Sequence, residues 1–94
     1  MELEDMKELF IKESTFENFP LIPQHTREAL LRYLNLGIPT GDFLKAVLTN
    51  KLYEAFEKAD RENLTALPYI VKWLNINVPT ICFGSEERFK EWTR

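Results

Sequence analysis

The segment over residues 41–59 constrains the fold of this chain more than any other feature. Its apolar residues recur every three or four positions, as they do on one face of an α-helix. These residues are Leu44, Leu48, Leu52, Ala55 and Ala59, with Phe56 beside them. Thr40 suits the N-cap position, and Asp42 suits the positive end of the helix dipole. The pattern predicts one continuous helix roughly 28 Å long.

A second surface of this predicted helix is also largely apolar, rotated from the first by about a third of a turn. It comprises Phe43, Ala46, Val47, Asn50 and Glu54. A helix that is apolar on two faces is usually central in a bundle or contacts another subunit. Asn50 has poor helix propensity, so we expect it to be solvated, to bond a neighbouring helix, or to contact a ligand or subunit.

Further helices are predicted over residues 2–13, 23–36, 65–75 and 86–93. Their boundaries follow from residues that begin or end helices: Pro23, Gly37, Thr65 as an N-cap with Pro68 in the first turn, and Ser85. Trp73 and Trp92 are predicted to lie in the core, and residues 80–83 to form a packed apolar loop. The predicted fold class is all-α, a small compact bundle of four to five helices around the long helix at 41–59.

The chain has 94 residues, which corresponds to a single globular domain. Residues 1–18 contain six acidic and two basic side chains, so we distinguish an acidic N-terminal helical segment (1–18) from a helical domain (19–94). The net charge of −3 comes from that segment, and no concentrated basic face is present. Generic nucleic-acid binding is therefore not expected.

Three features favour the cytoplasm as the location of this protein. Cys82 is the only cysteine, so no disulfide can form within the chain. No apolar stretch approaches the length of a membrane span, and the first residues lack the pattern of a secretory signal. We expect no association with a membrane.

The residues that usually carry catalysis are scarce. His25 and Cys82 are the only thiol–imidazole pair, but Cys82 lies among apolar residues and is better interpreted as a small buried hydrophobe. Asp60 and Asn63 are interpreted as turn and capping residues. No metal-ligand spacing and no glycine-rich phosphate loop occur. We therefore predict no enzyme activity, no metal and no cofactor.

An ordered set of short motifs covers residues 20–92. It comprises Gly37-Ile38-Pro39, Gly41-x-Phe43-Leu44, Ala46-Val47-Leu48, Asn50, Ala59-Asp60, Asn63 and Gly84-Ser85 before Trp92. This set resembles a family of small proteins encoded by phages and prophages. The chain departs from that pattern at Lys51, where the family usually has Asp, at Phe83, where it often has Trp, and at Pro68. Residues 1–18 are an addition to it.

No activity is established for that family, so the resemblance implies no catalytic residues. It implies an accessory protein of a bacterial virus, and proteins of this class commonly bind a host protein or sequester an immune signal. We therefore predict a non-enzymatic binding protein that interferes with host defence as a homo-oligomer, by enclosing a small nucleotide ligand between subunits. The alternative is a protein–protein adaptor that acts on replication or transcription machinery of host or phage.

The predicted ligand-binding or interface residues lie on two of the helices. They are Arg27, Arg32 and Tyr33 on the helix at 23–36, and Phe43, Val47, Asn50 and Glu54 on the helix at 41–59. Aromatic rings would stack on a base and arginines would bind phosphates. In the adaptor alternative, the acidic N-terminal helix would be the contact.

Overall fold

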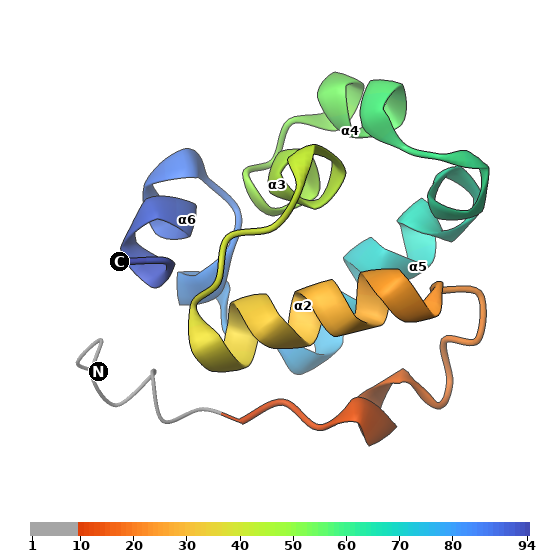
Figure 1. Ribbon diagram of the computed structural model, residues 1–94, viewed down its shortest axis with the longest axis horizontal. Helices are drawn as coiled ribbons and strands as arrows, with labels where there is room; N and C mark the ends of the chain where they lie inside the picture. The colour runs from red at the N-terminus through yellow and green to blue at the C-terminus, as the bar shows by residue number, and fades with distance from the viewer. Residues whose placement is uncertain (1–9) are drawn as a thin grey trace.

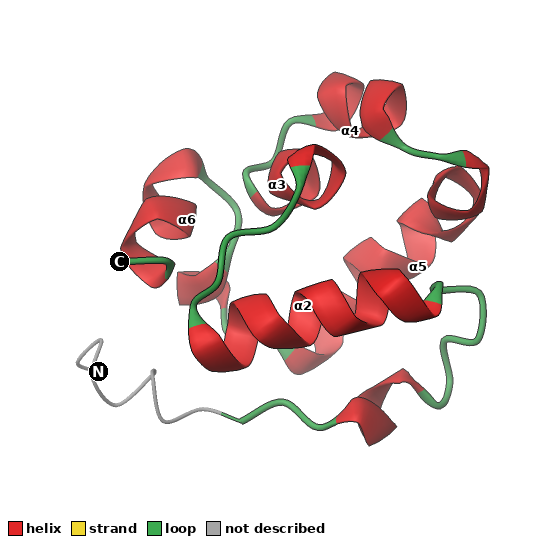
Figure 2. Ribbon diagram, in the orientation of Figure 1, coloured by secondary structure: helices red, strands yellow, loops and turns green. Residues whose placement is uncertain are grey.

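A computed structural model describes residues 10–94, and every regular element in that range is helical (Figure 2). The α-helices are α2 (Gln24–Leu36), α3 (Asp42–Leu48), α4 (Leu52–Lys58), α5 (Arg61–Asn77) and α6 (Glu86–Trp92). Two short 3-10 helices, η1 (Glu13–Phe16) and η2 (Thr80–Cys82), complete the order. The predicted all-α fold class is confirmed. None of these helices is long and apolar enough to span a membrane.

The helices surround one main core rather than forming parallel layers. Figure 1 shows α2 across the front, with the described part of the chain before α2 below it, α3 and α4 above, α5 at the right and α6 at the left. The largest enclosed side chains come from four elements: Phe16, Tyr33, Leu48, Ile70 and Trp73 are each fully buried. Trp92 bonds through its indole Nε1–H to the Tyr33 carbonyl oxygen at 2.8 Å, which joins α6 to α2. Trp73 and Trp92 are core residues, as predicted.

The segment before α2 is part of this core. Ile11 is buried, and its backbone N–H and C=O both bond the side-chain amide of Asn35 in α2. Phe16 stacks on Trp73 with a centroid separation of 4.2 Å. The predicted helix over 2–13 lies outside the described residues except at its end, where Phe10, Ile11 and Lys12 are not helical. Residues 11–16 therefore pack with the helical domain rather than apart from it.

The prediction of one helix over 41–59 is wrong, because the chain turns between α3 and α4. Asn50 has a left-handed backbone with φ of 64°. The Lys51 N–H bonds the Ala46 carbonyl, and the Asn50 N–H bonds the Val47 carbonyl. These two bonds define a Schellman motif, which ends a helix at a residue that tolerates positive φ. Asn is such a residue, which accounts for its position inside an otherwise helical pattern.

The turn gives a direct prediction for Asn50. Replacing Asn50 with Gly should leave the stability unchanged or raise it slightly, because glycine adopts positive φ without strain. Replacing it with Val should destabilise the protein by about 1–2 kcal/mol, the cost of a left-handed conformation for a residue with a bulky Cβ. Urea unfolding of both variants measures this difference. Equal stability of the two would contradict a left-handed turn at this position.

The long helix at the centre of the core is α5. It starts at Arg61, earlier than predicted, because the Asp60 carboxylate accepts a bond from the Asn63 N–H at 2.8 Å. Asp60 is therefore the N-cap in place of Thr65, and Pro68 lies inside the helix rather than in its first turn. The interpretation of Asp60 as a capping residue is confirmed. Pro68 is exposed, so its ring faces solvent.

Three smaller predictions are wrong: the N-cap of α3 is Gly41 and not Thr40, Pro23 precedes α2 as its N-cap and is not in its first turn, and Asn63 is buried within α5 and not at a cap. The predicted boundaries at Gly37 and Ser85 agree with the structure. Gly37 ends α2 with a left-handed φ of 70°, and a Cβ there would lie 3.0 Å from the Trp92 carbonyl oxygen. Ser85 caps α6 by accepting a bond from the Arg88 N–H. The predicted apolar loop at 80–83 contains η2, with Cys82 fully buried.

Candidate functional site

Two of the predicted contact residues are used by the fold itself. Tyr33 is fully buried, and its hydroxyl donates to the Cys82 carbonyl oxygen. Arg27 donates to the carbonyl oxygens of Ile22 at 2.8 Å and Phe19 at 3.1 Å, and its guanidinium lies over the Phe16 ring. The predicted roles of Tyr33 as a stacking ring and Arg27 as a phosphate ligand are corrected accordingly. Both side chains hold the segment before α2 and the loop at η2 against α2.

The other five predicted residues are accessible but do not form one site. Arg32 and Glu54 are exposed on different helices. Val47 and Asn50 line one groove, whereas Phe43 lines a separate cleft on α2 and α5. Phe43 and Val47 are half-buried and Asn50 is exposed, so none of these three is enclosed by the chain. The structure therefore replaces the predicted cluster with two distinct surfaces.

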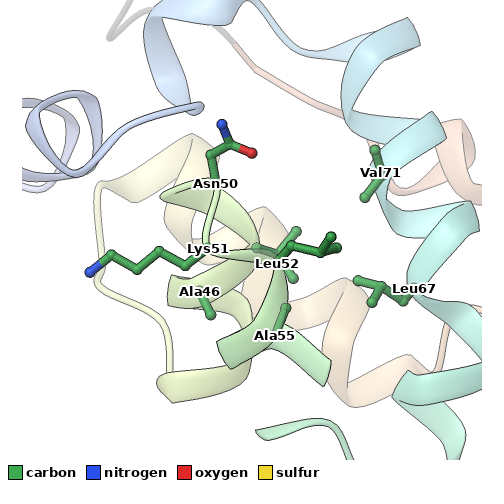
Figure 3. A pocket seen from close by; sticks show the side chains of 8 residues that line it. Ala46, Asn50, Lys51, Leu52, Ala55, Leu67 and Val71 are labelled. Carbon is green, nitrogen blue, oxygen red and sulfur yellow. The ribbon is translucent and has the colours of Figure 1, made fainter. Parts of the chain in front are cut away.

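The first surface is an apolar groove between the α3–α4 pair and α5. Leu52 and Ala55 of α4 face Leu67 and Val71 of α5 across it (Figure 3). Lys51 borders the groove, but its side chain points away from α5 and its amine lies 4.0 Å from Glu86. The groove encloses about 80 Å³, which is small, and its floor is the buried trio of Ala46, Ala55 and Leu67.

Large apolar side chains that line this groove, or that lie elsewhere on the same two helices, are exposed to solvent. We define the α4–α5 surface as this groove together with Leu52, Tyr53 and Phe56 of α4 and Leu64 and Val71 of α5. Their exposed fractions are 63%, 86%, 49%, 47% and 43%. Leu52 and Phe56 had been assigned to the inward stripe of a continuous helix. The turn at Asn50 changes the direction of the chain, so of that stripe within α4 only Ala55 remains buried.

The second surface is a cleft of about 270 Å³ with both polar and apolar walls, bordered by the N-terminal parts of α2, α3 and α5 and by the end of α4, which we call the His25 cleft. In Figure 1 these helices surround the central region of the molecule. The cleft is lined by His25, Thr26, Ala29, Gly41, Asp42, Phe43, Leu44, Lys58, Asp60 and Asn63. Of these, sequence reasoning had selected only Phe43 as a contact. Asp60 and Asn63 were interpreted as capping residues, and nothing in the sequence pairs them with His25, 35 and 38 positions away.

The structure does not bring His25 and Cys82 together as a nucleophile and a base. His25 lies beside Asp60 and Asn63, while Cys82 is buried against the Tyr33 hydroxyl. Burial raises the pKa of the Cys82 thiol to about 12, so the reactive thiolate is disfavoured. Within residues 10–94, no group of three or more His, Cys, Asp or Glu side chains is arranged to hold a metal ion.

Comparisons of the chain with known protein families, with curated proteins and with solved structures gave no significant match. The two surfaces are therefore interpreted from their own chemistry.

Proposed function

We propose that this protein is a non-enzymatic binding protein that works as a homodimer, with a second copy docked on the α4–α5 surface. The observation that carries the proposal is that α4 and α5, which line an apolar groove, also carry several large apolar side chains that are exposed to solvent. Tyr53 and Phe56 alone leave on the order of 200–300 Å² in water, given the usual area of aromatic side chains. With Leu52, Leu64 and Val71 the patch approaches the largest that monomers ordinarily expose, and such patches mark interaction sites.

The size of the patch suits a stable dimer. A standard interface buries about 800 Å² on each partner, and the core of a homodimer interface is about 65% apolar. The α4–α5 surface would supply the apolar core of such an interface. In a two-fold arrangement the same patch faces itself, so an apolar side chain that lines the groove, such as Leu52, can contact the groove of the partner.

The charges around the patch are compatible with self-association. Across a two-fold axis, a patch with one sign of charge would repel itself. The residues that define the α4–α5 surface are uncharged apart from Lys51, which lies near Glu86. The flanks of α4 carry two lysines and two glutamates, so they balance. A second copy therefore meets no net repulsion.

Enclosure of a nucleotide between subunits has less support than protein contact. Arg27 is occupied by carbonyl oxygens, and Arg32 lies neither on the groove nor in the cleft with Phe43. Neither arginine is therefore placed to bind a phosphate group with two parallel hydrogen bonds, which is the contact that the nucleotide hypothesis required. The phage setting, the bacterial cytoplasm and interference with host defence remain predictions from the resemblance. If these predictions hold, the dimer is the form of the protein that binds its target in the host.

Light scattering during size-exclusion chromatography tests the dimer. The native chain should have twice its 11.1 kDa mass. Leu52→Glu should shift the protein to monomer, because it places a charge of one sign on both sides of a desolvated interface. We expect the dissociation constant of the dimer to rise at least about tenfold, because one unpaired buried charge costs more than 1.4 kcal/mol.

Ile76→Glu is the matched control, because Ile76 is also on a helix and is 64% exposed, but it does not line the groove. This variant should remain a dimer. A native chain that is monomeric at high protein concentration would refute the proposal. So would equal dissociation of the two variants, because the effect would then reflect added charge and not the α4–α5 surface.

A further inference from the structure

The His25 cleft has a rigid polar floor. Thr26 and Asn63 are 2% and 5% exposed, and the Thr26 hydroxyl donates to Asn63 Oδ1 at 2.6 Å. The Asn63 backbone is held in turn by the Asp60 carboxylate. Because α2 and α5 are joined through this buried bond, the side chains above it have a defined arrangement. Defined polar groups at the base of a concave site are typical of small-molecule binding sites.

Two polar groups of the cleft, one a hydrogen-bond donor and one an acceptor, lie near the same nitrogen of His25. Asn63 Nδ2, a donor, lies 3.5 Å from His25 Nε2. Asp60 Oδ2, an acceptor, lies 3.6 Å from the same nitrogen. A neutral imidazole nitrogen is either a donor or an acceptor, so it bonds at most one of these two neighbours. His25 and Asp60 are both more than half exposed, so the other bond is open to water or to a ligand. Both distances are also at or beyond the limit of a hydrogen bond. These groups are therefore available to a ligand that has both a hydrogen-bond donor and an acceptor.

The other residues that line the cleft indicate which class of ligand it can bind. Asp42 and Asp60 supply carboxylates, and Lys58 supplies an ammonium group. Ala29, Phe43 and Leu44 form an apolar wall in the same cleft. The volume of about 270 Å³ is below the range that drug-sized ligands fill, so the ligand is small. A single lysine beside two carboxylates is a poor site for a nucleotide, which carries several negative charges.

We propose that the His25 cleft binds a small zwitterion of the amino-acid class. The ammonium group of the ligand pairs with Asp60 and Asp42, and its carboxylate pairs with Lys58 and accepts a bond from Asn63 Nδ2. An apolar side chain of the ligand packs against Phe43. An α-amino acid carries both charged groups on one carbon, so these charge-assisted contacts of opposite sign lie side by side, and both charged groups of the ligand are required. The cleft shares no lining residue with the groove of the α4–α5 surface, so ligand binding and dimerisation can fail independently.

Titration of the full ¹⁵N-labelled chain by NMR tests the ligand class. The probes are the common amino acids, with leucine compared against isopentylamine, which lacks the carboxylate, and 4-methylpentanoate, which lacks the ammonium group. At least one amino acid should shift the backbone signals of His25, Phe43 and Asn63 together. Each one-charge analogue of a bound amino acid should bind at least about tenfold more weakly, because it loses one of the two charge-assisted contacts.

Two variants locate the site without removing the fold. Asp60→Asn keeps a residue that caps helices as well as Asp does and removes only the charge. Lys58→Met removes the cation from an exposed position. Each should weaken amino-acid binding at least about tenfold. The control, Glu62→Gln, removes a carboxylate two positions along in the first turn of α5 that does not line the cleft, and it should bind as the native chain does.

Three results would overturn the assignment. The first is absence of binding by every amino acid at about 1 mM, a concentration that detects affinities near 4 kcal/mol. The second is binding of the amine or the carboxylate analogue as tightly as the zwitterion. The third is equal binding by Asp60→Asn and Glu62→Gln, which would place the ligand elsewhere on the chain.

Discussion

Replacing Trp73 with Ala should destabilise the protein by about 3–5 kcal/mol, the range seen for fully buried Trp and Phe side chains. Trp73 has no exposed surface, stacks on Phe16 at 4.2 Å and donates through its indole N–H to the Thr15 hydroxyl at 3.1 Å. The substitution therefore leaves a cavity and removes the contacts that hold η1 against α5. For a domain with a typical stability of 5–15 kcal/mol, this is a large fraction of the total.

Urea unfolding followed by circular dichroism measures this loss. Tyr69→Ala is the matched control on the same helix, because Tyr69 is aromatic but 42% exposed. Tyr69→Ala should lower the free energy of unfolding by less than half as much as Trp73→Ala does. Proteolysis should also cut the segment before α2 faster in Trp73→Ala than in the control, because Phe16 loses its stacking partner. Equal destabilisation by the two variants would contradict a core centred on Trp73.

Stability should fall steeply with pH above about 9. Burial raises the pKa of Cys82 from 9.0 to about 12, and burial together with the neighbouring Cys82 raises the pKa of Tyr33 above its usual value of 10. Both groups therefore keep their protons in the folded state at pH values where the unfolded chain releases them. Between about pH 9 and 12 the unfolded state binds fewer protons, so the free energy of unfolding decreases as pH rises. The slope is at most about 1.4 kcal/mol per pH unit for each group.

Thermal unfolding at several pH values from 7 to 11 checks this dependence. Cys82→Ala removes one of the two groups, so the decline should begin nearer the pKa of an unfolded tyrosine and be less steep. Tyr33 should still contribute, because its hydroxyl remains buried against the backbone of residue 82. A melting temperature that is constant up to pH 11 would show that neither proton is linked to folding. The experiment also reports on the site, because an accessible thiol near His25 would not behave in this way.

The positions of the predicted contact residues show how much of the candidate site could be predicted from the sequence. Phe43, Val47 and Asn50 were chosen because their helix had more apolar surface than one core can bury, and all three line accessible surfaces. Arg27 and Tyr33 were chosen by residue type, and both donate to backbone carbonyl groups, Arg27 to that of nearby Ile22 and Tyr33 to that of Cys82, 49 positions away. Residue type states what a side chain can bind. It does not state whether the chain already supplies that partner.

The sequence by itself determined the all-α class, the boundaries of α2 and α6, and the core positions of Trp73 and Trp92. These follow from local periodicity, from Gly37 and Ser85 at helix ends, and from the area of aromatic side chains, all of which act over a few residues. Only the tertiary structure decided the turn at Asn50. A continuous helix and two helices joined by a left-handed Asn have nearly the same local pattern, and burial of Ala46 and Ala55 against Leu67 of α5 accompanies the second.

The tertiary structure likewise decided which residues meet at the His25 cleft. His25 and Asn63 are 38 positions apart, and no local rule pairs them. They come together because α2 and α5 cross with Thr26 and Asn63 buried between them, where an unpaired hydroxyl or amide would cost about 1–3 kcal/mol. Local interactions thus specified the elements, and long-range burial specified which of their faces remain open for binding.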